Sequence, residues 1–585
     1  MGQIELRGIP AAPGITIGKV HLLDSEELVV KKKRIPQSQL KKEAVRFEDA
    51  LNKTRREIVE IKDKISVEMG REHGEIFSAH LLVLEDKVLI EEVKARLKKE
   101  KVVVEYIFLD VLKKYINAFS KIDDEYLKDR ISDINDVGKR ILRNLIGATH
   151  KILSDVGGEK VVVVAYDLSP SDTASMYKKD VIGIATDIGG RTSHTAIMAK
   201  SLEIPAVVGL ETITKRANNG DMIVVDGNHG VIIINPTKQT LLKYKSDQKR
   251  FRRFDEGLVY LKDLPCQTLD GRRVELVANI ELPEEVPSVL FHGAEGIGLY
   301  RTEFFYMNRR DLPTEEEHFQ GYKKVAQDMA PRHTIVRTLD LGGDKFLSEL
   351  EVPREMNPFL GWRAIRFCLA RPDIFKTQLK AILRASAFGK LKIMYPMISG
   401  LNELRQANVI LEEVKKELRA SKISFDEDIA VGAMIEVPSA ALTSDILAKE
   451  VDFFSIGTND LIQYSLAVDR VNEKIAYLYE PAHPAVLRLV KTIIDNGHKE
   501  GIWVGMCGEM AGDPNLTLIL LGLGLDEFST PSIMLPEIKH IVRSVKMADA
   551  KLIAQEALML PTGREVEAYA RKKLLELVSE TREGV

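Results

Sequence analysis

The chain has 585 residues, of which 45% are hydrophobic and 29% charged, and its net charge is −3 at pH 7. This length exceeds what one hydrophobic core fills and predicts roughly three or four domains, or fewer if one of them is a large barrel. The small net charge does not favour nucleic acid or an anionic membrane as the main partner. Apolar runs stay shorter than the roughly 20 residues that cross a bilayer. The three cysteines, Cys266, Cys368 and Cys507, are too widely spaced for a disulfide framework, so we expect a cytoplasmic protein without membrane insertion.

The N-terminal part of the sequence alternates between strand-like and helical segments. Residues 1–30 contain strand candidates separated by glycine and proline, chiefly Ile15–Leu23. In residues 31–147 the hydrophobic positions recur at helical spacing, which predicts amphipathic helices over 40–65, 73–99, 103–119 and 123–145. Strand character returns at 161–165, 181–185, 206–208, 222–225 and 231–234. We predict an α/β domain of residues 1–30 and 148–235, interrupted by an α-helical subdomain of residues 31–147.

Residues 236–260 form a highly charged segment that we interpret as a solvated linker helix. From there to the C-terminus, over 261–585, strand-like runs alternate with helical stretches, which is typical of a (β/α)8 TIM-type barrel. The predicted strands are 274–280, 296–300, 334–339, 391–395, 430–435, 453–456, 503–506 and 525–528. The fold class expected for the whole chain is therefore multidomain α/β.

One histidine stands at the start of a predicted helix within residues 189–200. A buried strand and the pair Gly189-Gly190 precede it, and Thr192 or Ser193 can cap the helix that begins at His194. The free N–H groups of the first turn and the positive end of the helix dipole favour an anion beside the ring. An isolated histidine here would more commonly be a cap or a turn residue, but the surrounding sequence favours a phosphoryl carrier.

Polar side chains follow nearly every predicted barrel strand, at the face where the active sites of such barrels lie. Glu436 and Asp460 end neighbouring strands and are oxygen ligands suited to Mg²⁺. Arg301, Arg337 and Arg470 supply guanidinium forks that fit a small phosphate- and carboxylate-bearing ligand. Cys507 is either a small packing residue or a proton donor. The other residues at or just beyond these strands are Glu281, Glu303, Asp340, Met397, Asn459, Glu509 and Ser529.

Seven sequence strings occur in the order found in enzyme I of the bacterial phosphoenolpyruvate-dependent sugar phosphotransferase system, and the chain resembles that family from end to end. The strings are Gly189-Gly190-Arg191-Thr192-Ser193-His194, Leu299-Tyr300-Arg301-Thr302-Glu303-Phe304, Arg337-Thr338-Leu339-Asp340-Leu341-Gly342-Gly343-Asp344-Lys345, Asn357-Pro358-Phe359-Leu360-Gly361-Trp362-Arg363, Met434-Ile435-Glu436-Val437-Pro438, Gly457-Thr458-Asn459-Asp460-Leu461 and Cys507-Gly508-Glu509-Met510-Ala511.

The resemblance implies a reaction. His194 would accept the phosphoryl group of phosphoenolpyruvate on Nε2 and pass it to a histidine of the carrier HPr, which would dock on the helical subdomain, while pyruvate leaves. The swivelling α/β domain would carry His194 to the barrel. Cys507 would donate the proton that completes pyruvate, Arg301, Arg337, Asn459, Asp460 and Arg470 would bind the substrate, and Glu436 with Asp460 would bind Mg²⁺. Arg363, Lys345, Asp167 and Ser169 would have supporting roles; where Ser169 stands the family usually has threonine. The family also implies a homodimer formed through the barrel.

Three alternatives compete with this interpretation. Pyruvate phosphate dikinases and phosphoenolpyruvate synthases share the two domains but carry a large nucleotide-binding domain, and the sequence contains no matching glycine-rich loop. The nitrogen-regulatory paralogue would carry an additional N-terminal sensory domain. A catalytically silent scaffold that binds HPr would have lost motif residues, and all of them are present.

Overall fold

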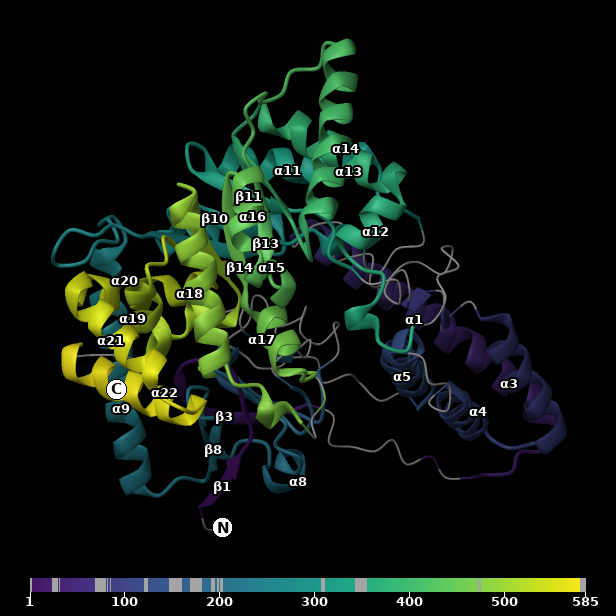
Figure 1. Ribbon diagram of the computed structural model, residues 1–585. Coiled ribbons are helices and arrows are strands. Elements are labelled where there is room, and N and C mark those ends of the chain that lie inside the picture. Colours follow the sequence, from purple (N-terminus) through teal and green to yellow (C-terminus); the bar gives the residue numbers. More distant parts are fainter. Residues whose placement is uncertain are drawn as a thin grey trace. The chain divides into compact units, whose positions relative to one another are not determined.

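The computed structural model describes residues 3–23, 30, 32–68, 80–81, 83–84, 86–119, 125–146, 160–168, 181–190, 195–196, 199, 204–306, 311–341, 355–470, 472 and 475–578 (Figure 1). The chain divides into two compact units, Met1–Phe251 and Arg252–Val585. Among the described helices, none has both the length and the apolar character needed to cross a bilayer.

A helical bundle occupies the early part of the first unit. Its helices are α1 (Leu40–Glu68), α3 (Lys87–Glu100), α4 (Val104–Phe119) and α5 (Glu125–Ile146). Their apolar faces share one core, in which the rings of Phe47 on α1 and Phe108 on α4 lie 5.7 Å apart. Arg46 ties three helices together: it pairs with Glu43 at 2.6 Å and Glu105 at 3.3 Å, and donates to the carbonyl of Leu145 at 2.9 Å.

The predicted helix over 73–99 is interrupted in the structure: residues 80–81 and 83–84 are helical, and α3 begins only after Asp86. Asp86 has extended backbone, and its side chain accepts hydrogen bonds from the N–H groups of Val88 and Leu89, so it caps a helix that begins at Lys87. An aspartate in this position satisfies N–H groups that the first turn leaves free, which fixes the helix start. Residues 73–79, 82 and 85 of the predicted helix lie outside the described residues.

The first unit also contains an eight-stranded sheet. Its strands are β1 (Ile4–Arg7), β2 (Ile9–Ala12), β3 (Ile15–Leu22), β4 (Val161–Ala165), β5 (Val181–Thr186), β6 (Ala206–Val208), β7 (Met222–Asp226) and β8 (Val231–Ile234), in the order β1-β8-β7-β3-β4-β5-β6-β2. A short helix, α8, spans Ile213–Arg216.

The centre of this sheet is parallel, because β3, β4, β5 and β6 pair in that sense. Of these strands, β4, β5 and β6 are buried along nearly their whole length. Along β4, Val161, Val163 and Ala165 join one hydrophobic core while Val162 and Val164 join another. This explains the continuous apolar runs in the sequence. Strands from both sides of the helical segment thus build one sheet, as an insertion requires, although the domain boundaries themselves remain predictions.

The charged segment after β8 is helical. Helix α9 (Lys238–Leu258) covers most of the predicted linker of residues 236–260, and the division between the two units falls within it.

The second unit contains the predicted barrel. Eight parallel strands close on themselves: β9 (Glu275–Ile280), β10 (Ile297–Tyr300), β11 (His333–Arg337), β12 (Lys390–Tyr395), β13 (Val431–Ile435), β14 (Phe453–Gly457), β15 (Trp503–Cys507) and β16 (Glu527–Thr530). The closing contact pairs the last strand with the first, Glu527 opposite Glu275. The predicted strand 525–528 was placed two residues too early, so Ser529 lies within β16 rather than beyond it.

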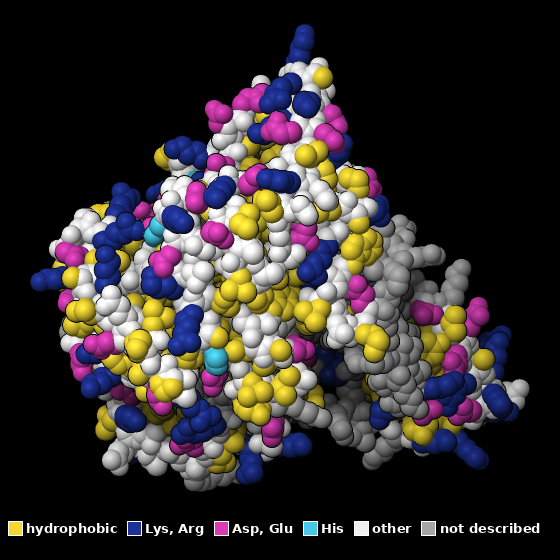
Figure 2. Space-filling view, viewed as in Figure 1, with side chains coloured by type: hydrophobic (Ala, Val, Ile, Leu, Met, Phe, Trp, Pro, Cys, Tyr) yellow, Lys and Arg dark blue, Asp and Glu magenta, His cyan; other side chains and the backbone are white. Residues whose placement is uncertain are grey.

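Side chains alternate between the barrel interior and its surrounding helices. Leu299, Ile335, Met394, Met434, Phe453 and Cys507 form a cluster of their own, whereas the intervening residues join the large core beneath the helices. The helices lie outside the strands (Figure 1): α10 (Val286–Phe291), α11 (Glu315–Met329), α12 (Ile365–Ala370), α13 (Pro372–Ser386), α14 (Leu401–Ala420), α15 (Pro438–Leu442), α16 (Ser444–Leu447), α17 (Thr458–Leu466), α18 (Pro484–Lys499), α19 (Pro514–Leu523), α20 (Leu535–Ser544), α21 (Met547–Met559) and α22 (Gly563–Leu577). On the face drawn in Figure 2, acidic and basic side chains are interspersed.

Candidate active site

Arg337 ends strand β11 and lies at the carboxyl end of the barrel with only 9% of its surface exposed. Its two terminal nitrogens pair with Glu303 and Asp340, each at 2.7 Å. Burial works against the charged guanidinium, but the two carboxylates outweigh it and raise the pKa of Arg337. The Arg337 guanidinium is therefore permanently charged and held in one position at the carboxyl end of the barrel.

Asp340 is shared between two arginines. One oxygen accepts from Arg337, and the other lies 2.8 Å from Arg363. Arg363 also reaches the hydroxyl of Tyr464 at 3.5 Å and a carboxylate oxygen of Asp460 at 3.8 Å. The network thus joins the loop after β11 to helix α17 and holds two guanidinium groups at one end of the barrel.

Glu436 follows strand β13 and is 1% exposed. Its Oε1 accepts a 2.6 Å hydrogen bond from the backbone N–H of Met397. Burial raises the pKa of Glu436 well above the ordinary range, and the negative charges of Asp460 and Asp340 raise it further. A Cβ on Gly457 would approach Oε2 to 2.6 Å, so glycine keeps room beside that oxygen. The site favours a cation here, because a cation would relieve the repulsion among these carboxylates.

Helix α17 presents Asn459 and Asp460 in its first turn, directly after β14. The Asn459 side-chain oxygen accepts the N–H of Glu509 at 3.2 Å. The neighbouring Gly508 has φ 124°, and a Cβ there would collide with the Thr458 hydroxyl. Glycine is therefore needed where the segment after β15 approaches α17.

Cys507 ends strand β15 inside the barrel and is 2% exposed. Ser455, on the neighbouring β14, donates a hydrogen bond to its sulfur at 3.3 Å. Burial raises the pKa of Cys507 to about 11, although Ser455 and the charge of Arg337 act in the opposite direction. At neutral pH the thiol is thus protonated and able to give up a proton.

Arg301 and Arg470 are more accessible than Arg337. Arg301 pairs with Glu281 at 2.5 Å and its side chain is 34% exposed, while Arg470 lies 3.6 Å from Glu509 and is 32% exposed. Each guanidinium group is partly exposed to solvent and lies next to a carboxylate. Such forks are suited to bind an anionic ligand that arrives from solvent.

Some predicted site residues lie outside the described part of the chain: His194, Ser169 and Lys345. Around them, the carboxylate of Asp167 accepts the N–H of Leu168 at 2.8 Å, and Gly189 has φ 123° in the predicted turn. The backbone is helical at Thr195 and Ala196. These neighbours match a turn followed by a helix.

Two residues of this region were not singled out from the sequence. Tyr464 lies one turn beyond Asp460 on α17, donates to the Phe359 carbonyl at 2.5 Å and contacts Arg363. Ser455 precedes Gly457 by two positions on β14 and therefore faces the same side of the strand, inside the barrel. The strand alternation could have identified Ser455, whereas the Tyr464 contact depends on where the loop before α12 runs.

Three family descriptions match the chain: "PEP-utilising enzyme, N-terminal" over residues 7–130, "PEP-utilising enzyme, mobile domain" over 157–230 and "PEP-utilising enzyme, PEP-binding domain" over 255–547. A protein of Haemophilus influenzae named phosphoenolpyruvate-protein phosphotransferase is 48% identical over 98% of this chain and 99% of its own length. The namesake protein of Geobacillus stearothermophilus is 48% identical over 97% and 98%. The chain belongs to the phosphoenolpyruvate-protein phosphotransferase family.

A solved structure titled as the NMR solution structure of Enzyme I (nEIt) is 46% identical and covers 42% of this chain and 99% of that one, with a TM-score of 0.37. Membership of the phosphoenolpyruvate-protein phosphotransferase family makes the chain an enzyme and confirms the resemblance drawn from its motifs. It also decides against the dikinase and synthase alternative, because the match spans nearly the whole of both chains.

Proposed function

We propose that the protein transfers the phosphoryl group of phosphoenolpyruvate to Nε2 of its own His194 and then to a histidine of the carrier protein HPr, with release of pyruvate. The network in which Asp340 holds Arg337 and Arg363 beside Glu436 and Cys507 carries this proposal. It combines fixed positive charge, a carboxylate that favours a cation and a protonated thiol at one end of a barrel.

Substrate binding rests on the arginines. Arg301, Arg337 and Arg470 would bind the phosphate and carboxylate oxygens of phosphoenolpyruvate, with Asn459 adding a hydrogen bond. Asp340 and Glu303 hold the Arg337 fork in place before substrate arrives, so little reorganisation is needed on binding. Arg363 is a positioning residue, because it acts through Asp340 and Tyr464.

The metal that the family implies fits the acidic residues present. Glu436 and Asp460 would hold a divalent cation, which we propose to be Mg²⁺, since both offer only oxygen and the Met397 hydrogen bond occupies just one oxygen of Glu436. Bound there, the ion would neutralise charge on the substrate oxygens. Repulsion among Glu436, Asp460 and Asp340 supports a cation at this place.

Loss of the phosphoryl group leaves the enolate of pyruvate, which needs a proton on carbon. Cys507 would supply it: the thiol S–H bond breaks, a C–H bond forms, and the thiolate left behind lies near the positive charge of Arg337. Ser455 would donate its hydrogen bond to that thiolate. The thiol then regains a proton from solvent before the next cycle.

His194 belongs by sequence to the first unit and the barrel to the second. In-line transfer brings the acceptor nitrogen to roughly 3 Å from phosphorus. We therefore include in the proposal a movement that brings the His194 segment to the carboxyl end of the barrel and then to HPr on the helical subdomain. On the basis of the family resemblance, the proposal also includes a homodimer formed through the barrel and a cytoplasmic location.

A coupled assay tests the whole reaction. The protein is mixed with phosphoenolpyruvate, Mg²⁺ and purified HPr, and pyruvate is followed with lactate dehydrogenase. We expect pyruvate in proportion to HPr, and only one turnover per active site without it. Pyruvate formation that continues without HPr, or phosphorylation of HPr from ATP instead, would contradict the proposal.

A further inference from the structure

A second polar cluster lies inside the barrel at the end opposite to the candidate active site. Glu275, His333 and Glu527 are each the first residue of their strands, β9, β11 and β16. Because all barrel strands are parallel, these positions meet at the amino-terminal end. The proposed phosphotransfer uses none of them.

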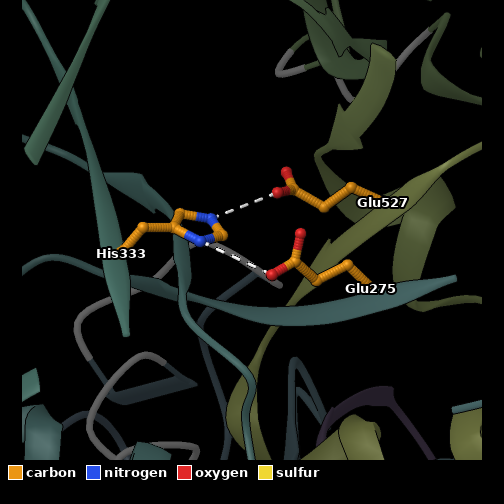
Figure 3. A group of neighbouring side chains, drawn as sticks. All are labelled: Glu275, His333 and Glu527. Atoms are coloured by element: carbon orange, nitrogen blue, oxygen red, sulfur yellow. Dashed lines mark ion pairs between the residues drawn. The ribbon is translucent and has the colours of Figure 1, made fainter. Parts of the chain in front are cut away.

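The three side chains point toward one another (Figure 3). His333 Nδ1 lies 3.5 Å from Glu275 Oε1, and His333 Nε2 lies 3.4 Å from Glu527 Oε2. These separations exceed the roughly 2.7–2.9 Å of a charge-assisted hydrogen bond. The Nε2–Oε2 separation matches the edge of about 3.4 Å between ligands of a tetrahedral metal with bonds of about 2.0–2.1 Å. Because the two ring nitrogens point away from each other, one ion binds only one of them, and Nε2 is the nitrogen that faces the buried Glu527. One ligand atom from each residue lies within 4.8 Å of the other two.

The buried carboxylate of Glu527 lacks hydrogen-bond donors among the described residues. Glu527 is 1% exposed, and neither of its oxygens has a hydrogen-bond partner among the described residues; the same holds for His333 Nε2. Buried carboxylates are normally hydrogen-bonded or bound to a cation, because leaving them bare is costly. Glu527 and the nitrogen that faces it therefore form an incomplete pair.

The local charge also favours a cation. The carboxylates of Glu275 and Glu527 both face the single imidazole of His333. Lys392 on β12 has its ammonium over aromatic rings, 4.5 Å from the ring centroid of Trp503 and 5.7 Å from that of Phe453.

Two glycines lie against the cluster. A Cβ on Gly505 would stand 2.8 Å from Glu527 Oε1, and one on Gly296 would stand 3.0 Å from the His333 ring. Glycine at both places keeps the sides of the cluster free. The Glu275 side chain is 42% exposed, which gives an ion a path from solvent and lets this carboxylate turn toward Nε2.

We propose that Glu275, His333 and Glu527 bind a divalent transition-metal ion of the Zn²⁺ type, distinct from the catalytic cation at the other end of the barrel. One imidazole nitrogen and two carboxylate oxygens suit Zn²⁺ better than Mg²⁺, which prefers oxygen alone. Water completes the coordination. The ion joins β9 to β16, where the barrel closes, and ties both to β11. It is therefore a structural site that stabilises the closed barrel.

The test uses the full-length protein, stripped of metal by a chelator and titrated with Co²⁺ in excess Mg²⁺, which keeps the catalytic site occupied. We expect one equivalent of Co²⁺ with the visible absorption of a low-coordinate N/O site, and a higher Tm after Zn²⁺ is added. Glu527→Gln and His333→Gln should weaken Co²⁺ binding at least 10-fold. Glu284→Gln, which removes an exposed carboxylate of the same unit, serves as the matched control and should bind normally.

Two further variants keep the test decisive. Glu275→Gln alters only the partly exposed ligand, so it replaces Glu527→Gln if the buried variant fails to fold. Glu436→Gln separates the two ends of the barrel and should leave Co²⁺ binding intact. Equal Co²⁺ binding by the wild type and the Glu275, His333 and Glu527 variants would overturn the proposal, as would binding that disappears in Glu436→Gln alone. Failure of the phosphotransfer assay would leave these results unaffected.

Discussion

The backbone N–H of Met397 donates a 2.6 Å hydrogen bond to Oε1 of Glu436. Met397 has φ 56°, a left-handed conformation that costs a non-glycine residue about 1–2 kcal/mol. Met397, in the segment after β12, is therefore strained, and its N–H fixes one carboxylate oxygen of Glu436, which follows β13. The other oxygen, beside Gly457, remains for a ligand.

Glu436→Gln should abolish the metal-dependent reaction without unfolding the protein. The amide oxygen can still accept the Met397 hydrogen bond, but the negative charge is lost. We expect Mg²⁺ affinity to fall at least 10-fold and kcat by about 100-fold or more, measured by calorimetry and by pyruvate release. Glu450→Gln, which removes an exposed partner of Arg405, is the control. Normal kcat at saturating Mg²⁺ would show that Glu436 is no metal ligand.

Mg²⁺ binding should release protons and strengthen as pH rises. The pKa of Glu436 is raised in the metal-free site, so at a pH below that pKa the cation must displace a proton to bind. The same shift makes the metal-free protein less stable as pH rises through the folded-state pKa of Glu436, because the native state binds the extra proton. Calorimetry in buffers of different ionisation enthalpy measures the release. Glu436→Gln should remove it, and pH-independent binding would contradict the assignment.

Arg337→Lys should weaken both substrate binding and the barrel. Lysine keeps the charge but cannot bridge Glu303 and Asp340, so a buried carboxylate loses its partner. We expect KM for phosphoenolpyruvate to rise about 10-fold or more, with a loss of roughly 1–3 kcal/mol in the free energy of unfolding. Steady-state kinetics and denaturant titration measure the two effects. Arg371→Lys, at an exposed pair with Asp373, should change neither.

Cys507 should stay protonated throughout the neutral range. Since burial raises its pKa to about 11, its alkylation rate should climb steadily with pH and show no plateau below pH 9. Mass spectrometry of the native protein treated with iodoacetamide measures this. Cys507→Ala should slow pyruvate formation while phosphorylation of His194 survives. Turnover at the wild-type rate would assign the cysteine to packing.

Much of the fold could be predicted because periodicity reports burial directly. The strands Val161–Ala165 and Ala206–Val208 were placed to the residue, since both are buried runs between turns. The predicted helix boundary was wrong where a single side chain sets it. Asp86 caps α3 through hydrogen bonds from backbone N–H groups, so the helix begins at Lys87, and helical spacing does not reveal such a cap.

The candidate site was likewise predictable only in part. Strand ends correctly grouped Arg337, Glu436 and Cys507 inside one barrel. The link from Asp340 through Arg363 to Tyr464 depends on loop paths and could not be derived from spacing. The cluster of Glu275, His333 and Glu527 could not be predicted from spacing, because its members begin three strands that are far apart in the chain and meet only when the barrel closes.

Labelling with phosphoenolpyruvate tests most directly whether His194 carries the phosphoryl group. The protein is incubated with [³²P]phosphoenolpyruvate and Mg²⁺, and the bound label is then exposed to acid and to base. We expect label that is lost in acid, survives in base, is absent from His194→Ala and moves to HPr on its addition. Label that persists in His194→Ala, or that comes from ATP but not from phosphoenolpyruvate, would contradict the assignment.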